Sequence, residues 1–297
     1  MFDFRYHALS LTAVFIALAV GLLLGVAIGD SGLVSSADRK LRESLRSDVN
    51  EAGRQLKSAQ GDVAEANRFQ REVYPLLVAG QLDDRSIGLV FLGNPGKDLT
   101  DDVQDALRDT GAELRSVAAT GNPTNLAEAG RIAVGTRYAD LATSPEPDLD
   151  LVQDFGFRIG AQYVNPGKLL TMERSTIFET FNPGNAELQP LDAVVVVYDP
   201  DELEKGYARN ARDRFDRGFV DGLRESRIPV VGIERSSTEP SRIGWYKDRD
   251  ISSVDDVEET SGRASLVFTL QGSKQGAFGR KDSADGLLPD IVGAKQP

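Results

Sequence analysis

The stretch ALSLTAVFIALAVGLLLGVAIG, residues 8–29, decides how this chain is organised. It runs for 22 residues without a charge, and at about 1.5 Å of rise per residue a helix of that length is roughly 33 Å long. The hydrocarbon core of a bilayer is about 30 Å thick. We therefore predict a single transmembrane anchor over residues 1–30.

Two other interpretations of this stretch stay open. A cleaved signal peptide usually has an apolar region of only about 7–15 residues, and Ala27-Ile28-Gly29 resembles its cleavage site only loosely. A buried helix of a soluble core rarely continues this far without a charge. The length of the stretch favours a retained anchor.

Small residues recur at every fourth position of the predicted anchor, which places them along one face of a helix. They are Ala13, Ala17, Gly21, Gly25 and Gly29. Small side chains let a second membrane helix approach closely, so we predict that this stripe is a helix-packing surface. Because Gly and Ala are common in membrane helices generally, the alternative is a spacing without a packing role.

Residues 31–80 are predicted to form a coiled-coil stalk, because apolar and small residues alternate three and four positions apart. The seam is thin: Gln70 interrupts it, and Gly53 and Gly61 each cost about 1 kcal/mol in an exposed helix. The alternative is an amphipathic helix folded against its own domain. The predicted seam residues are Leu45, Val49, Ala52, Leu56, Ala59, Val63, Ala66 and Val73.

Residues 84–292 are predicted to form a three-layer α/β domain of Rossmann-like or flavodoxin-like type, followed by a short tail, 293–297. Apolar strands that alternate with amphipathic helices indicate a mainly parallel sheet covered on both faces. We expect one helix to begin at the N-cap Thr100. The expected strands are 86–92, 113–118, 192–198, 229–233 and 263–270, and the expected helices are 100–110, 148–163 and 201–227, with 131–135 either a strand or a helix end.

Composition excludes several kinds of chemistry. The net charge is −12 and the pI is about 4.7, which argues against a nucleic-acid-binding protein. There is no Cys, and the single His, His7, lies at the edge of the predicted anchor. A catalytic triad with His, a Cys–His pair and His-ligated zinc or iron are therefore excluded from the α/β domain. We predict no enzyme activity, no catalytic or metal-binding residues and no cofactor.

Three segments of the α/β domain resemble binding motifs only in part. Gly93-Asn94-Pro95-Gly96 lies where a nucleotide loop would be, but it fits no phosphate-loop pattern and acidic residues follow it. The acidic run 199–204 starts like a calcium loop, but Leu203 replaces an oxygen ligand. Residues 272–281 are basic and Gly-rich, typical of a flexible loop that either binds a ligand or is simply solvated.

The sequence resembles a known family in several places. The N-terminal Asp3-Phe4-Arg5-Tyr6-His7 is followed directly by the apolar run 9–18 and a Gly-rich span. Together with the coiled-coil stretch, Gly88-Leu89-Val90, and the end of the chain from Leu266-Val267 to Gly286-Leu287-Leu288-Pro289, it is similar to the actinobacterial MctB family.

The resemblance implies an envelope protein without assigned catalytic residues. The family is described as a copper-transport protein, a channel of the mycobacterial outer membrane that prevents copper build-up. Its SteB branch is described as a septal membrane protein whose extracytoplasmic coiled coil engages a regulator of a peptidoglycan hydrolase. Both descriptions place the α/β domain outside the cytoplasm. Positive charges next to an anchor favour the cytoplasmic side, and by that rule the residues after the anchor would place the domain in the cytoplasm: Arg39, Lys40, Arg42 and Arg46.

The function predicted from the sequence is therefore a non-enzymatic, single-pass envelope protein of the MctB type that acts through coiled-coil association. Its expected partners are the membrane and either further copies of itself or a partner coiled-coil protein, but not nucleic acid. One alternative is a copper transport or efflux channel made of several copies. Another is an α/β enzyme with a carboxylate site that the sequence does not locate.

Overall fold

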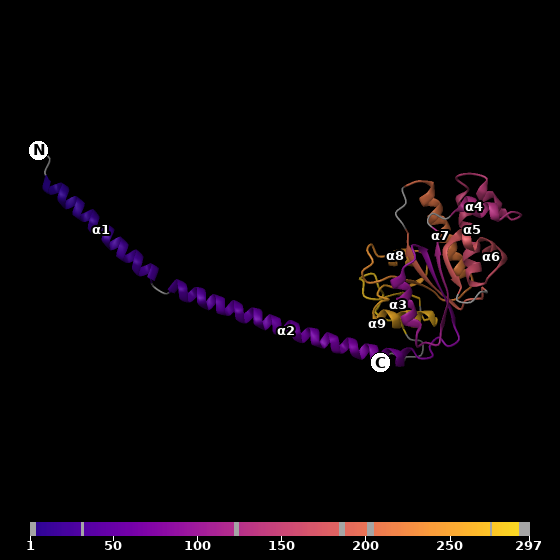
Figure 1. Ribbon diagram of the computed structural model, residues 1–297, viewed down its shortest axis with the longest axis horizontal. Helices are drawn as coiled ribbons and strands as arrows, with labels where there is room; N and C mark the ends of the chain where they lie inside the picture. Colours follow the sequence, from indigo (N-terminus) through magenta and orange to yellow (C-terminus); the bar gives the residue numbers. More distant parts are fainter. Residues whose placement is uncertain are drawn as a thin grey trace. The chain divides into compact units, whose positions relative to one another are not determined.

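The computed structural model describes residues 4–30, 33–121, 125–183, 188–200, 205–273 and 275–290. The chain divides into two compact units, Met1–Arg68 and Phe69–Pro297. The helices and strands of both units are labelled along the chain in Figure 1.

The first unit consists of helix α1 (Phe4–Asp30) and most of helix α2 (Leu33–Val78). Tyr6–Gly29 is long and apolar enough to cross a membrane, and its most apolar stretch of 18 residues is not buried anywhere in the structure. The N-terminal apolar helix predicted from the sequence is therefore confirmed. Its role as a retained anchor stays a prediction from length and composition.

The second unit is built on a seven-stranded sheet with the order β3-β2-β1-β4-β5-β6-β7. All neighbouring strands are parallel except β3, which is antiparallel to β2. Without β3, the strands follow the flavodoxin-like order, in which the second strand precedes the first. The strands are β1 (Ser86–Gly93), β2 (Glu113–Thr120), β3 (Phe178–Pro183), β4 (Ala193–Asp199), β5 (Val230–Ile233), β6 (Ser252–Val254) and β7 (Ala277–Phe278).

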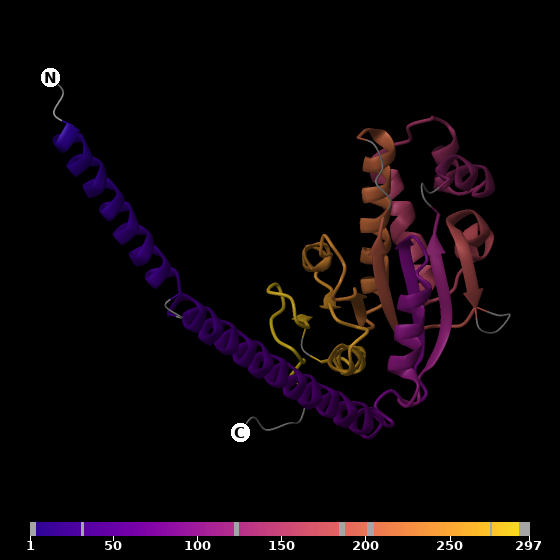
Figure 2. The ribbon, with the colours of Figure 1, turned by 60° about the vertical axis from the view of Figure 1, so that its left-hand side comes forward.

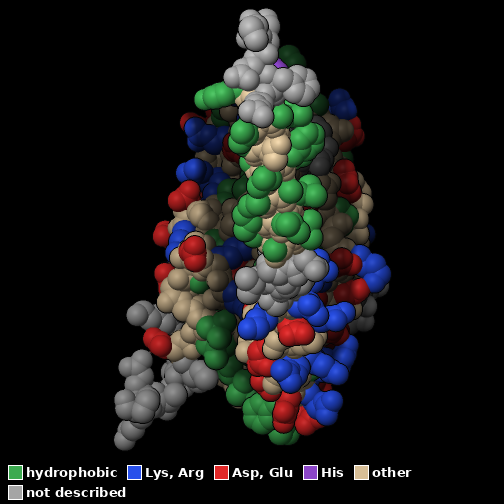
Figure 3. Space-filling view, turned by 90° about the vertical axis from the view of Figure 1, so that its left-hand side faces the viewer, with side chains coloured by type: hydrophobic (Ala, Val, Ile, Leu, Met, Phe, Trp, Pro, Cys, Tyr) green, Lys and Arg blue, Asp and Glu red, His purple; other side chains and the backbone are tan. Residues whose placement is uncertain are grey.

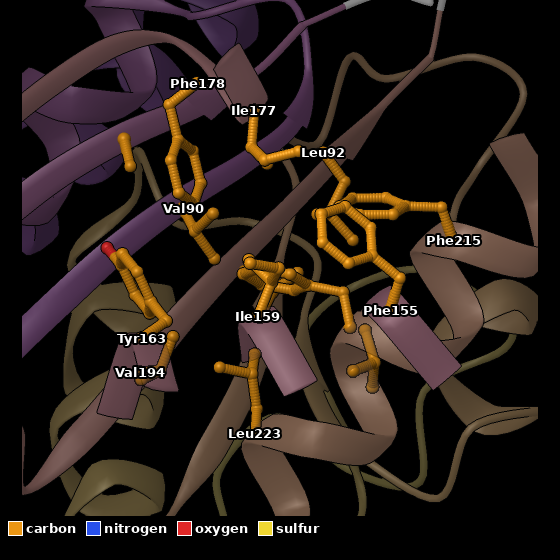
Figure 4. Close-up of a cluster of buried hydrophobic side chains, with 14 of the residues drawn as sticks. Val90, Leu92, Phe155, Ile159, Tyr163, Ile177, Phe178, Val194, Phe215 and Leu223 are labelled. Carbon is orange, nitrogen blue, oxygen red and sulfur yellow. The ribbon is translucent and has the colours of Figure 1, made fainter. Parts of the chain in front are cut away.

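Helices cover both faces of this sheet, as predicted. Alternate residues of β1 point to opposite faces: Leu89 and Phe91 enter one hydrophobic cluster, and Val90 and Leu92 the other. The first cluster is closed by α3 (Lys97–Leu107), α9 (Thr260–Leu270) and the end of α2. The second cluster, drawn in Figure 4, is covered by α4 (Leu126–Ile132), the 3-10 helix η1 (Arg137–Ala142), α5 (Leu149–Val164), α6 (Lys168–Ile177), α7 (Tyr207–Glu225) and α8 (Ile243–Lys247).

Helices α5 and α7 cross at very short range, and Figure 2 shows them side by side over the sheet. Each carries a G-x-x-x-G motif at the crossing, Gly156–Gly160 on α5 and Gly218–Gly222 on α7. A Cβ atom at Gly160 would lie 2.0 Å from the carbonyl oxygen of Phe219. Because no side chain fits there, glycine is what permits the two backbones to meet.

Several predicted elements differ in the structure. The expected last strand, 263–270, is wrong: these residues belong to α9, which is buried on nearly every side and so lacks the polar face that marks a surface helix. Thr100 is not the N-cap; α3 begins one turn earlier after Gly96, whose carbonyl oxygen accepts from the Thr100 amide. Residues 131–135 are a helix end. Of the expected helix 201–227, α7 forms Tyr207–Glu225 after a turn at 205–206, and 201–204 lie outside the described residues.

Candidate functional site

The predicted small-residue stripe lies on an open face of α1. A Cβ atom added at Gly21, Gly25 or Gly29 would meet no atom of the chain within 4 Å. Three stripe residues share a shallow groove with larger apolar neighbours, and Ala13 and Gly29 are not part of it. The groove is lined by Val14, Ala17, Leu18, Gly21, Leu22, Gly25 and Val26. Figure 3 shows apolar side chains over the visible face of α1, and charged ones on α2.

The predicted seam of α2 is exposed along its first four large residues. Leu45, Val49, Leu56 and Val63 each keep between 54% and 69% of their surface accessible. The three alanines of the seam are exposed as well. Four large apolar side chains at regular spacing on one exposed helix form a surface that a partner helix would bury.

The last three turns of α2, which belong to the second unit, have two different faces. Tyr74 and Val78 are buried in a hydrophobic cluster, and the Tyr74 hydroxyl donates to the carbonyl oxygen of Ala106 over 2.8 Å. Phe69 and Leu76 are 67% and 80% exposed, and Val73 between them is half-buried. The alternative of a helix folded against its own domain therefore holds for these last turns.

Phe69 and Leu76 are missing from the predicted seam. The three-four spacing of the seam places Gln70 at a seam position, so the apolar residue one place earlier falls outside the predicted seam. The spacing of Phe69, Val73 and Leu76, four and then three residues apart, was the available signal. These residues continue the apolar stripe past the polar interruption.

The basic end of the 272–281 segment is fixed at the carboxyl edge of the sheet. The Lys281 ammonium donates to the carboxylate of Glu234 over 2.6 Å and to the carbonyl oxygen of Thr238 over 2.8 Å. The Asp255 carboxylate, at the end of β6, accepts from the backbone amides of Arg280 and Lys281. This end of the segment is therefore held in place rather than a free loop: it includes strand β7, and Glu234 pairs with the charge of Lys281.

Three buried carboxyl groups have pKa values raised to about 6 or 7. Burial, with a smaller contribution from Glu128, raises the pKa of Glu173 to about 7, and neither of its oxygens has a hydrogen-bond partner. Burial raises the pKa of Asp216 and of Asp256 to about 6. They lie on α6, on α7 and after β6, and none of the three is among the charges that shift the pKa of another. Within the described residues no three His, Cys, Asp or Glu side chains gather into a metal site.

The loop after β1 lies at the position where flavodoxin-like sheets bind ligands. Here the backbones of Gly93 and Asp199 touch: a Cβ at Gly93 would lie 1.9 Å from the Asp199 carbonyl oxygen. The amide of Asn94 donates to that same oxygen over 3.1 Å. Asp98 follows in the first turn of α3. The arrangement is a tight structural turn with an acidic helix start, which repels phosphate.

An apolar helix able to span a membrane is followed by a helix with an exposed apolar seam and by the α/β domain of the second unit, called the head from here on. This order indicates a membrane-associated protein with a folded head. The chain belongs to the MctB family: the family described as "Copper transport outer membrane protein, MctB" matches residues 1–289. The chain is 24% identical over 295 residues to the copper transporter MctB of Mycobacterium bovis, and equally so to that of two Mycobacterium tuberculosis strains. Each alignment covers 91% of this chain and 92% of the relative.

The side chains of this chain are a poor match for copper. Copper(I) prefers Cys and Met, and copper(II) prefers imidazole. The chain has no Cys, two Met and one His. Among the described residues these are Met172 on α6 and His7 on α1, which belong to different units. The family description therefore names a cargo for which this chain has few typical ligands.

Proposed function

We propose that this chain is a non-enzymatic, single-pass envelope protein that works by holding helices together. In this proposal α1 anchors the chain and packs through its small-residue groove. The seam of α2 binds the equivalent helix of a second copy or of a coiled-coil partner. The α/β head lies outside the cytoplasm, as the resemblance to the family implies.

The observation that carries the proposal is the exposed seam of α2. Burying one Val or Leu side chain contributes about 1.5–3 kcal/mol, so the four large seam residues supply several kcal/mol when a partner covers them. The alanines between them add little, and Gly53 and Gly61 weaken the helix. Confinement of both helices to one membrane compensates for this weak association, because it raises the effective concentration of the partner helix.

Regulation of a cell-wall hydrolase is the specific role that we propose, following the SteB branch. A partner coiled coil at the seam would connect the anchored chain to such a regulator. Copper transport, which the names of the family and of its relatives describe, is the second candidate. It would require several copies around a pore, because α1 has no ionisable side chain between Ala8 and Gly29.

The association proposal is tested by crosslinking in native membranes. The chain has no Cys, so Ala59→Cys introduces a single thiol at the seam. We expect an oxidative crosslink to a second copy or to a partner, and its loss when Leu56→Asp and Val63→Asp are added. The matched control adds Ser58→Asp and Ala64→Asp, which are exposed away from the seam. Equal crosslinking in both double variants would contradict the proposal.

The side of the membrane is tested with an impermeant thiol reagent on intact cells. Ser237→Cys places a thiol on the exposed surface of the head. We expect labelling before lysis. Ser265→Cys is the control, because Ser265 is fully buried and its thiol should react only after denaturation. Protection of the position 237 thiol until lysis would place the head in the cytoplasm.

A further inference from the structure

Helix α6 carries a carboxylic acid at a position of its buried face where an apolar side chain is expected. Leu170, Glu173 and Ile177 follow one another at helical spacing, and each is 0% exposed. Leu170 and Ile177 belong to the hydrophobic cluster of Figure 4, in which Ile177 is labelled. Neither oxygen of Glu173 has a hydrogen-bond partner within the described residues. A negative charge on this carboxyl group would therefore be buried without compensation.

The charged groups around Glu173 do not remove this cost. Helix α6 packs against α4, α5 and β3. On α4, Glu128 is close enough to raise the pKa of Glu173 further, after burial, and Glu128 itself pairs with Arg131. The other charged residues of these elements in the described chain are not among the groups that shift this pKa: Asp150, Asp154 and Arg158 on α5, Glu179 on β3, and Lys168 and Arg174 on α6 itself.

Helix α4 and the 3-10 helix η1 form one compact cap over this part of the core, residues 126–142. Their backbones touch, because a Cβ atom at Gly130 would lie 2.3 Å from the amide nitrogen of Ala142. Toward α5, the Tyr138 hydroxyl of the cap donates to the carboxylate of Asp154 over 2.8 Å. The two short helices are therefore expected to move together, since each supports the other.

Helix α6 is tied to the rest of the head at both ends. In its first turn the Leu170 amide donates to the side-chain oxygen of Gln162 on α5 over 2.8 Å. At its other end the carbonyl oxygen of Ile177 accepts from the amide of Gly121 over 2.8 Å, and the chain continues directly into β3 of the sheet. When water has to reach Glu173, the cap is therefore the element that moves.

We propose that residues 126–142 are a pH-operated cap, which stays closed while Glu173 is protonated and opens when its carboxyl group ionises. Leu126 and Leu141 of the cap also line a pocket of about 410 Å³, together with Phe215 of the core cluster. Opening the cap removes one wall of this pocket and exposes the core beneath it. The device is separate from the helix surfaces of α1 and α2, so it goes beyond the association proposed above.

The direction of the switch follows from the two states of the carboxyl group. With the cap closed, burial raises the pKa of Glu173 to about 7, whereas in water its pKa returns to the ordinary 4.5. The closed state therefore holds the proton more tightly than the open state. Opening becomes more frequent as the pH rises from about 4.5 to about 7 and changes little above that.

Hydrogen–deuterium exchange of the full chain in lipid nanodiscs tests the cap. The wild type and Glu173→Gln are compared at the same pH, so that the intrinsic exchange rates cancel. We expect the amides of residues 126–142 to exchange at least about tenfold faster in the wild type at pH 8, and within about threefold of the variant at pH 4.5. Glu179→Gln, at an exposed position of β3, is the control and should match the wild type at both pH values. Equal exchange of the wild type and Glu173→Gln at pH 8 would overturn the proposal.

The central strand β4 separates cap opening from unfolding of the whole head. Its buried amides, Val194–Val197, exchange when the head unfolds. After correction for intrinsic rates, we expect the cap amides of the wild type at pH 8 to exchange at least about tenfold faster than those of β4. Equal protection of the cap and of β4 would mean that water reaches Glu173 only by global unfolding, which would overturn the local switch.

Discussion

The same G-x-x-x-G spacing occurs in two regions of this molecule with opposite surroundings. In the head, Gly156 and Gly160 of α5 face α7 so closely that added Cβ atoms would lie 2.3 Å and 2.0 Å from backbone oxygens. On α1, Gly21 and Gly25 repeat the spacing, and added Cβ atoms would meet nothing within 4 Å. One motif has its partner helix within the chain, and the other has none among the residues that the structure describes.

This difference shows how the motif works. Glycines four residues apart remove the side chains from one face of a helix, so that a second backbone can approach. Around the α5–α7 crossing, the aromatic rings of Phe155, Phe215 and Phe219 pack beside the glycines. On α1, Val14, Leu18 and Leu22 flank the groove in a similar way. We infer that a helix from another chain takes the place on α1 that α7 takes on α5.

The largest effect is expected for Gly160→Leu in the head. The new side chain must displace the backbone of Phe219, so we expect a loss of more than about 3 kcal/mol in the free energy of unfolding. Denaturant unfolding followed by the fluorescence of Trp245 measures this. Gly244→Ala is the control, because a Cβ there meets no atom within 4 Å. Similar stabilities of the two variants would show that the crossing is not as tight as described.

Glu173→Gln tests the stability of the head without touching either set of glycines. The pKa of Glu173 in the folded head, about 7, lies above the ordinary value of 4.5. The folded state therefore holds the proton more tightly, and stability falls as the pH rises from about 4.5 through about 7.

Because Gln carries no charge to bury, we expect the Glu173→Gln variant to be more stable than the wild type by about 1–3 kcal/mol at pH 8, with little difference at pH 4.5. Unfolding curves at both pH values check this. A difference that does not change with pH would contradict the raised pKa of Glu173. Crosslinking through Ala59→Cys on α2 should stay unchanged.

A smaller effect is expected for Gly21→Leu combined with Gly25→Leu on α1. Filling the groove should weaken membrane-helix association by about 1–2 kcal/mol, roughly a tenfold loss of association. Fluorescence energy transfer between labelled copies in vesicles measures this for self-association. Leu23→Ile is the control, since residue 23 does not line the groove. Unfolding of the head should be unaffected, in contrast to Gly160→Leu.

The smallest effect is expected for Gly53→Ala and Gly61→Ala on α2. Both positions have open space around them, and alanine stabilises an exposed helix by up to about 1 kcal/mol relative to glycine. We expect increased seam crosslinking through Ala59→Cys. A decrease would mean that these glycines are themselves sites of close helix approach.

The parts of the fold that follow from periodicity were predictable from the sequence. The uncharged run gives α1, the apolar rhythm gives α2, and runs such as Ala193–Asp199 give the central strands. In α9 the same kind of apolar run, around Leu266–Phe268, misled the prediction, because a fully buried helix and a buried strand have similar composition. Strands β6 and β7, of three and two residues, are too short to show a period.

Prediction of the candidate sites from the sequence has the same limit: only local patterns are visible in it. The stripe and the seam are patterns along single helices, so they could be found without a structure. The partner of a stripe is not encoded locally: nothing around Gly160 indicates that Phe219 lies across from it. The Arg212–Asp216 pair has ordinary helical spacing, and only the fold shows that it is buried beside a pocket.

A cysteine scan of α2 in native membranes tests the central claim most directly. Single Cys variants from position 45 to position 69 are oxidised, and the crosslinked fraction of each is measured. The account predicts maxima with a seven-residue period at Ala52, Ala59 and Ala66, and minima at Ser58 and Ala64. A flat profile, or maxima on the opposite face of the helix, would contradict the claim that the exposed seam is an association surface.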